Sequence, residues 1–186
     1  MRKGIVSALM IPLLLLAGCG GREAKPEQSF HDFREAVLSA QKITVDAHLT
    51  ADYGDSVEEY ALSAVYDGSE TTVTVTEPLL IAGVTARSRW GETEIEYGDV
   101  LIGMGQLDEN GLSPAAALPV IFEAMAGGYT ELLWWDGDLL AARLYAGEDS
   151  RCTVWLDPDT LIPTAAEIAS NGRRVISCEL TDWIIQ

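Results

Sequence analysis

The chain is poor in the residues on which most enzymes and nucleic-acid-binding proteins depend. Its 186 residues include two histidines, three cysteines and 12 lysine or arginine residues, against 29 aspartate or glutamate residues. The histidines, His31 and His48, are far apart, and no histidine, cysteine and aspartate cluster has metal-ligand spacing. A net charge of −17 repels phosphate, which excludes nucleic acid and anionic lipid head groups as partners held by charge.

Catalytic and nucleotide-binding motifs are missing as well. The sequence contains no Gly-x-Ser-x-Gly, no phosphate-binding loop and no dinucleotide fingerprint. Acidic pairs such as Glu58 with Glu59, and Glu94 with Glu96, are typical of solvated strand faces rather than of paired catalytic carboxylates. We therefore expect a protein that is not an enzyme and that uses no cofactor and no metal ion.

The N-terminal apolar run is too short to cross a bilayer. It extends from Gly4 to Leu16, which is 13 residues, whereas a membrane-spanning helix needs about 20. Arg2 and Lys3 precede it. A positive start, a short apolar segment and small residues after it form the layout of an export signal.

The sequence Leu16-Ala17-Gly18-Cys19 resembles the lipobox of bacterial lipoproteins. The resemblance implies that Cys19 receives a diacylglyceryl group, that a peptidase cuts before it, and that the new amino terminus can then be acylated, for example with palmitate. Two or three acyl chains hold a protein stably on a membrane. We therefore expect a signal peptide at 1–18 and a lipid anchor at Cys19, on the extracytoplasmic face of the cell membrane.

The chain after the signal divides into a short tether and one domain. Residues 20–28 are glycine-rich and then charged, with Ala24 as their apolar residue, which is typical of a linker. Together with Cys19 they make a lipidated tether (19–28) that reaches at most about 30 Å. Loss of 18 residues, Arg2 and Lys3 among them, would leave 168 residues with a net charge of −19, so a single domain is expected at 29–186.

The domain pattern predicts a helix and then several strands. Apolar residues at helical spacing indicate a helix over 29–41, with Ser29 as its N-cap. Alternating apolar and polar residues then predict antiparallel strands. The expected strands are 42–53, 57–68, 70–78, 79–90 and 93–105.

A second, unusually apolar helix interrupts the strands. Ser113 followed by Pro114 is a strong helix start, and Gly127-Gly128 is a strong stop. The only charge between them is Glu123, so the helix must be buried, either in a core or in a cavity. Pro119 is expected to bend the helix or split it in two.

The remaining sequence predicts strands at 130–136, 138–147, 150–157, 161–170 and 173–185. Asp136-Gly137 and Asn171-Gly172 are dipeptides of type I′ hairpin turns. In a simple meander, Cys152 and Cys178 would flank Ala165 about 9.6 Å apart. A disulfide needs Cα atoms within about 7 Å, so two free, half-buried thiols are expected.

The C-terminal strands carry a local pattern, formed by Trp155-Leu156-Asp157-Pro158, Leu161-Ile162-Pro163, Glu167-Ile168, Asn171-Gly172 and the closing strand to Trp183. With the element order above, this pattern resembles the LolA/LolB-like superfamily, whose members are half-open antiparallel barrels covered by helices. The same turn residues would also suit any antiparallel sheet. The resemblance implies a mainly β (α+β) fold, a half-open antiparallel β-barrel whose concave face receives an apolar ligand.

Two functions remain open for such a chain, because an anchored protein cannot serve as a diffusing carrier. The first is a monomeric, lipid-binding lipoprotein of the cell envelope that holds a lipid, an acyl chain or a lipoprotein. Its ligand-binding residues would be Trp90, Leu118, Ile121, Phe122 and Met125. The second is a protein-interaction lipoprotein, similar to clostridial germination lipoproteins, that binds or stabilises an envelope or germination enzyme. The two differ in whether the apolar helix is a movable lid or a permanent core.

Overall fold

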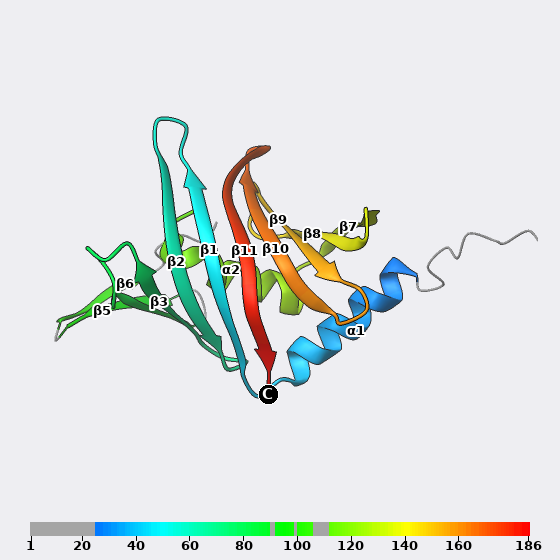
Figure 1. The fold of residues 1–186 in the computed structure, drawn as a ribbon, viewed down its shortest axis with the longest axis horizontal. Coiled ribbons are helices and arrows are strands. Elements are labelled where there is room, and N and C mark those ends of the chain that lie inside the picture. Colours follow the sequence, from blue (N-terminus) through cyan, green and yellow to red (C-terminus); the bar gives the residue numbers. More distant parts are fainter. Residues whose placement is uncertain (1–24, 90–91, 99, 106–111) are drawn as a thin grey trace, which may run out of the picture.

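The fold is one antiparallel sheet curved around two helices. A computed structural model describes residues 25–89, 92–98, 100–105 and 112–186. Within these residues the strands are β1 (Ile43–Asp52), β2 (Val57–Tyr66), β3 (Thr71–Glu77), β4 (Thr85–Arg89), β5 (Glu92–Tyr97), β6 (Val100–Gly105), β7 (Thr130–Asp136), β8 (Leu139–Tyr145), β9 (Ser150–Asp157), β10 (Ile162–Ser170) and β11 (Arg173–Ile185). They form an 11-stranded sheet in the order β6-β5-β4-β3-β2-β1-β11-β10-β9-β8-β7, the predicted half-open barrel (Figure 1).

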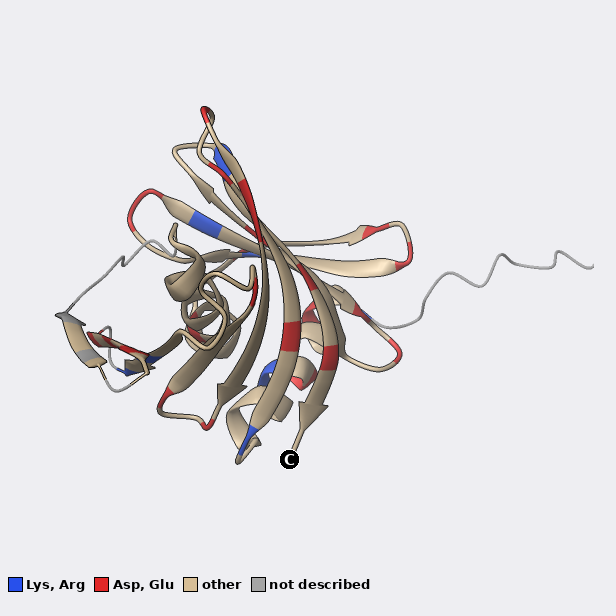
Figure 2. Cartoon of the chain, turned by 60° about the vertical axis from the view of Figure 1, so that its left-hand side comes forward, with Lys and Arg blue, Asp and Glu red and all other residues tan. Residues whose placement is uncertain are grey.

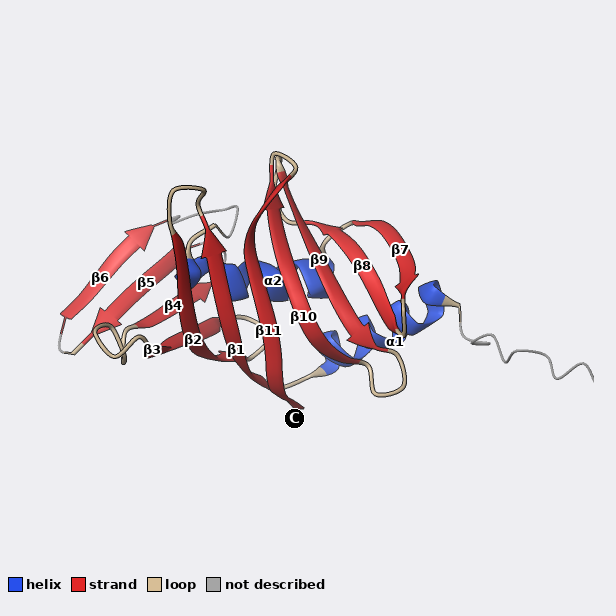
Figure 3. Cartoon of the chain, turned by 45° about the horizontal axis from the view of Figure 1, so that its top comes forward, coloured by secondary structure: helices blue, strands red, loops and turns tan. Residues whose placement is uncertain are grey.

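The helices α1 (Pro26–Ser39) and α2 (Pro114–Gly127) lie on the same face of the sheet, behind the strands in Figure 3. The chain leaves the first set of strands at β6 and enters the second at β7, and these are the two outermost strands in the sheet order. Because α2 lies between them in the chain, it crosses the inner face, where it contacts β3 and β4 on one side and β8 and β9 on the other. The topology therefore explains why this helix is apolar on nearly all sides.

Alternation along the central strands separates an apolar inner face from a polar outer face. In β1, the residues Ile43, Val45, Ala47, Leu49 and Ala51 are buried, while the residues between them are partly or fully exposed. The same alternation runs through β9. This is the period of two expected for a sheet with one covered face. We call the side of the sheet that carries no helix the free face.

The first helix starts earlier than its sequence pattern indicates. It begins at Pro26, which occupies the first helical position after Lys25 and donates no backbone hydrogen bond. Ser29 is buried within the helix, so the prediction that it is the N-cap is wrong. The helix also takes in residues 26–28, which shortens the predicted tether.

Two of the predicted strands are divided differently. Residues 78–84 form turns, in which Leu79 and Leu80 are exposed, and only Thr85–Arg89 of the expected 79–90 strand joins the sheet as β4. The apolar start of that segment carries no strand alternation. The expected 93–105 strand is a hairpin of β5 and β6, which turns at Gly98 with a φ of 61°.

The two predicted hairpin turns have different outcomes. Asn171 and Gly172 have φ values of 51° and 76°, as a type I′ turn requires. In the other hairpin β7 continues to Asp136, which pairs with Leu139. The turn residues are therefore Gly137 and Asp138, and of these only Gly137 has a positive φ, of 61°, so the prediction of type I′ geometry at Asp136-Gly137 is wrong.

Cys152 and Cys178 are free, as predicted, but they are fully buried rather than half-buried. Irregularities at both ends of β10 shift the simple meander, so that Cys152 faces Ile168 and Cys178 faces Ala166. Burial raises the pKa of the Cys178 thiol to about 12. It also raises the pKa of Cys152, and the nearby Cys178 adds to that increase.

The thiols should therefore be unreactive in the folded protein, because the thiolate is the reactive form and both groups are shielded from solvent. In a Cys19→Ser variant of the full chain at pH 8, we expect no reaction with a thiol-specific chromogenic disulfide before denaturation and two reactive thiols after it. Ser177→Cys, which adds a thiol on the free face next to Cys178, should react quickly. Fast native labelling of Cys152 or Cys178 would contradict the buried placement.

Candidate functional site

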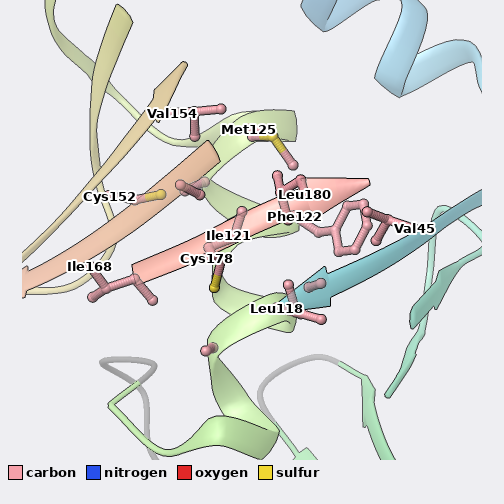
Figure 4. Packing of buried hydrophobic residues seen from close by; sticks show 14 of the residues in the cluster. Val45, Leu118, Ile121, Phe122, Met125, Cys152, Val154, Ile168, Cys178 and Leu180 are labelled. Atoms are coloured by element: carbon pink, nitrogen blue, oxygen red, sulfur yellow. The ribbon is translucent and has the colours of Figure 1, made fainter. Parts of the chain in front are cut away.

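Four of the predicted ligand-binding residues meet inside the barrel. Leu118, Ile121 and Phe122 are each 1% exposed and Met125 is 0% exposed. Figure 4 shows them directed from α2 towards β-strand residues such as Val45, Cys178 and Leu180. They are part of one continuous hydrophobic core, so α2 fills the space in which an apolar ligand was expected. Trp90 and Cys19 lie outside the described residues.

Phe122 forms the centre of an aromatic stack. Its ring lies 5.2 Å from that of Tyr66 in β2 and 5.5 Å from that of Trp183 in β11, and both pairs are stacked. Asp182, with a φ of 50°, lies at an irregularity of the β1–β11 register. The extra residue turns Trp183 inward, where its Nε1–H has no hydrogen-bond partner among the described residues.

The two ends of α2 are held by different interactions. At the start, the Ser113 side chain accepts a hydrogen bond of 3.3 Å from the Ala116 backbone N–H, which confirms the predicted N-cap. Pro119 does not split the helix, which continues unbroken to Gly127. Burial of the neighbouring residues on α2 compensates for the hydrogen bond that proline cannot donate.

At the C-terminal end, α1 holds α2 through Arg34. The guanidinium donates to the carbonyl oxygens of Met125 at 3.0 Å and Ala124 at 3.3 Å, and also to that of Gly128. It lies over the Phe30 ring at 4.8 Å, and partial burial lowers its pKa. Carbonyls at a helix end have no partner within the helix, so this contact satisfies them and fixes α1 against α2.

Gly128 ends the helix for a reason that the sequence does not reveal. Its backbone is extended, with a φ of −63°, rather than left-handed as a glycine stop would suggest. A Cβ there would lie 2.7 Å from the Ala124 carbonyl oxygen and 2.9 Å from that of Tyr145. Glycine is therefore required because the backbone of α2 meets the backbone of β8 at this point.

A wide groove crosses the free face, opposite the helices. Its volume is about 870 Å³, and it runs over the central strands from β2 to β9. Small side chains form much of its floor, among them Thr50, Ala61, Ala165 and Ser177. Glu77 and Pro78 border it on one side, and Asp136 with Leu139 and Trp155 on the other. The sequence alone did not predict this groove. The signal it offered is that these small residues alternate with buried ones along the strands.

Carboxylates dominate the charge of the groove. Among the described residues, no lysine or arginine lines the groove, and the acidic residues that do are Glu59, Glu77, Asp136, Glu167 and Glu179. Figure 2 shows acidic residues along the strands and turns, with few basic ones. Glu167 pairs with Arg174 at 2.7 Å and Asp136 accepts a 2.8 Å hydrogen bond from Trp155 Nε1. Among the described residues, Glu59, Glu77 and Glu179 form no ion pair.

The part of the chain that the structure describes contains no group of three or more histidine, cysteine or acidic residues placed to hold a metal ion. In the same residues, neither helix is long and apolar enough to span a membrane.

The close backbone approach at Gly128 predicts that alanine substitutions at two adjacent glycines have opposite effects on the stability of the protein. Gly128→Ala should destabilise the protein by about 1–3 kcal/mol, because the added methyl group meets backbone that cannot move freely. Gly127→Ala is the matched control, since nothing lies within 4 Å of its Cβ position, and should stabilise the helix by up to about 1 kcal/mol. Urea midpoints would measure both. Equal effects of the two substitutions would contradict the contact between α2 and β8.

Comparisons place the fold among known structures. No family model matches the sequence, and no curated protein matches it significantly. A proposed outer-membrane lipoprotein-sorting domain from Vibrio parahaemolyticus is 11% identical, with a TM-score of 0.51, over 87% of this chain and 94% of that chain. An uncharacterised conserved protein from Thermus thermophilus is 11% identical, with a TM-score of 0.50, over 87% and 88%.

A LolA-superfamily protein from Nitrosomonas europaea is 12% identical, with a TM-score of 0.47, over 88% of this chain and 94% of that chain. Sequence identities this low support only a similarity of fold. The open sheet, the antiparallel order of its strands and the two helices on one face nevertheless agree with the architecture expected from the C-terminal strands. The chain has a half-open antiparallel β-barrel fold, similar to that of the lipoprotein-sorting domain from Vibrio parahaemolyticus.

Proposed function

We propose that this protein is a non-catalytic lipoprotein of the cell envelope that works by binding a protein partner on the free face of its sheet. The observation that carries the proposal is the division of the barrel into two unlike sides. The inner side is filled by α2, and its four large inward side chains, Leu118, Ile121, Phe122 and Met125, are at most 1% exposed. The free face has an open groove of about 870 Å³.

The energy of opening the inner side supports this choice. Exposing one large apolar side chain costs about 1.5–3 kcal/mol, so exposing Leu118, Ile121, Phe122 and Met125 together would cost about 6–12 kcal/mol. The whole free energy of unfolding of a domain is about 5–15 kcal/mol. A lid movement of α2 would therefore require nearly as much free energy as unfolding, unless a ligand replaced its contacts.

The anchor supports a function close to the membrane. With Cys19 lipidated, the domain would remain on the extracytoplasmic face of the cell membrane, held only by its acyl chains. The net charge of the chain after cleavage, −19, would keep the protein body away from anionic head groups. A monomer that is fixed in this way can hold an envelope or germination enzyme near the membrane, whereas it cannot carry a ligand between membranes.

The second candidate function is the binding of a lipid, an acyl chain or a lipoprotein inside the barrel. The observation that favours it is the buried Nε1–H of Trp183, which has no partner among the described residues and lies beside Phe122. An ester or amide carbonyl could accept a hydrogen bond from it. In this function Trp90, Leu118, Ile121, Phe122 and Met125 would contact the ligand after α2 had moved.

Hydrogen exchange of the full-length lipoprotein in nanodiscs distinguishes the two functions. If α2 is permanent core, its amides should exchange as slowly as those of β1 and β11, and a diacylated peptide should not change them. Phe122→Asp should then unfold the protein, because it buries an unpaired charge, while Phe122→Leu should remain folded.

The opposite pattern would overturn the proposal. Exchange in α2 more than about tenfold faster than in β1, slowed by the diacylated peptide, would establish α2 as a lid. A folded Phe122→Asp variant that no longer responds to the peptide would then assign the ligand to the inner side.

A further inference from the structure

We infer that the groove on the free face is a docking site for an extended, basic segment of the partner protein. The inference rests on the proposed function and specifies the chemistry of the partner. It follows from three features of the described residues: a floor of small side chains, carboxylates spread across several strands, and an aromatic border.

The register places one groove carboxylate at each end of a row of residues that crosses the sheet. Glu59 in β2 pairs with Thr50, Thr50 with Ser177, and Ser177 with Glu167 in β10. Three steps of about 4.8 Å between strands separate the backbone positions of the two residues by about 14 Å across the sheet. Thr50 and Ser177, between them, are small and leave the centre of the row hollow.

A second row repeats this arrangement. Glu77 in β3 pairs with Ala61, Ala61 with His48, and His48 with Glu179 in β11. Two further steps lead through Ala165 to Trp155. Each row therefore has acidic residues with backbone positions about 14 Å apart, and in the second row Ala61 and His48 lie between them.

These distances favour a chain of spaced charges over a single ion. No three acidic or histidine side chains of the described residues converge on one point. An extended peptide rises about 3.3–3.4 Å per residue, so basic residues four apart are about 13–14 Å apart and match either row. Long basic side chains can lie over the small floor while their charges reach the carboxylates.

The border at Trp155 adds a contact that favours a cation. Its Nε1–H donates to Asp136 at 2.8 Å, which fixes the ring at the edge of the groove. A lysine or arginine side chain over an indole face is stabilised by a cation–π interaction. Tyr60 also lines the groove and donates a hydrogen bond to Glu58.

Other classes of occupant fit less well. Nucleic acid, anionic lipid and a second copy of this chain, with its net charge of −17, would all bring negative charge to carboxylates. Among the described residues, Glu59, Glu77 and Glu179 have no basic partner within the protein. A basic protein segment would supply that partner.

The test uses the full-length lipoprotein in phosphatidylcholine nanodiscs and a dye-labelled probe peptide, Lys-Ser-Thr-Ser-Lys-Ser-Thr-Ser-Lys. Fluorescence anisotropy should show saturable binding that weakens at least fivefold between about 20 mM and about 150 mM salt. The same peptide with glutamate in place of lysine should not bind.

Two pairs of variants locate the binding. Ala165→Phe fills the floor without changing charge and should weaken binding at least fivefold, whereas Ala169→Phe, on the same strand but outside the groove, should leave it unchanged. Glu59→Gln with Glu179→Gln should weaken binding, whereas Glu92→Gln with Glu148→Gln makes the same charge change elsewhere and should not. Circular dichroism would verify that each variant is folded.

The outcomes separate this inference from the proposed function. Equal weakening by both glutamine pairs, or full binding by Ala165→Phe, would mean that the peptide senses only net charge, and would overturn the groove site. Absence of peptide binding while α2 stays protected from exchange would overturn the basic segment alone. Fast exchange of α2 with an effect of the diacylated peptide would overturn the proposed function instead.

Discussion

The structure depends on one topological constraint, which is that the chain has to pass from one edge of the sheet to the other. The first six strands end at β6 and the last five begin at β7, and these are opposite edges. Because α2 makes this passage across the inner face, it is in contact with sheet on one side and with α1 on another. A helix in that position can carry few charges, and its burial closes the concave side that an open barrel would otherwise present.

The same constraint determines which side of the sheet remains available for recognition. Once α2 occupies the interior, the side chains still available for recognition are those that alternate with the core residues. Across the central strands these are acidic towards the ends of each row, with Thr50 and Ser177 in the middle of one row and Ala61 and His48 in the middle of the other. The free face therefore combines a recessed floor with negative charge, although each strand viewed alone has an ordinary amphipathic pattern.

Most of the architecture was accessible from the sequence because its signals are local. Period-two alternation located β1 to β3 and β7 to β11, and Ser113 with Pro114 located the start of α2. The details that failed depend on contacts between distant segments. Arg34 reaches carbonyls 90 or more residues away, and the two irregularities in β10 are set by its neighbours on both sides. The same holds for the candidate site. The apolar character of α2 could be predicted from its residues, but whether the helix lines a cavity or fills it depends on how the sheet curves around it.

The pairing of β1 with β11 has a consequence for the biogenesis of the protein. Ile43 pairs with Ile185, 142 residues later in the sequence. Contacts so distant along the chain slow folding, because a long loop has to close before they form. The two halves of the sheet cannot join until β11 has been synthesised, because β11 lies between β1 and β10. Until β11 is available, β1 lacks one of its two neighbours in the sheet, and the inner face of each half stays incomplete.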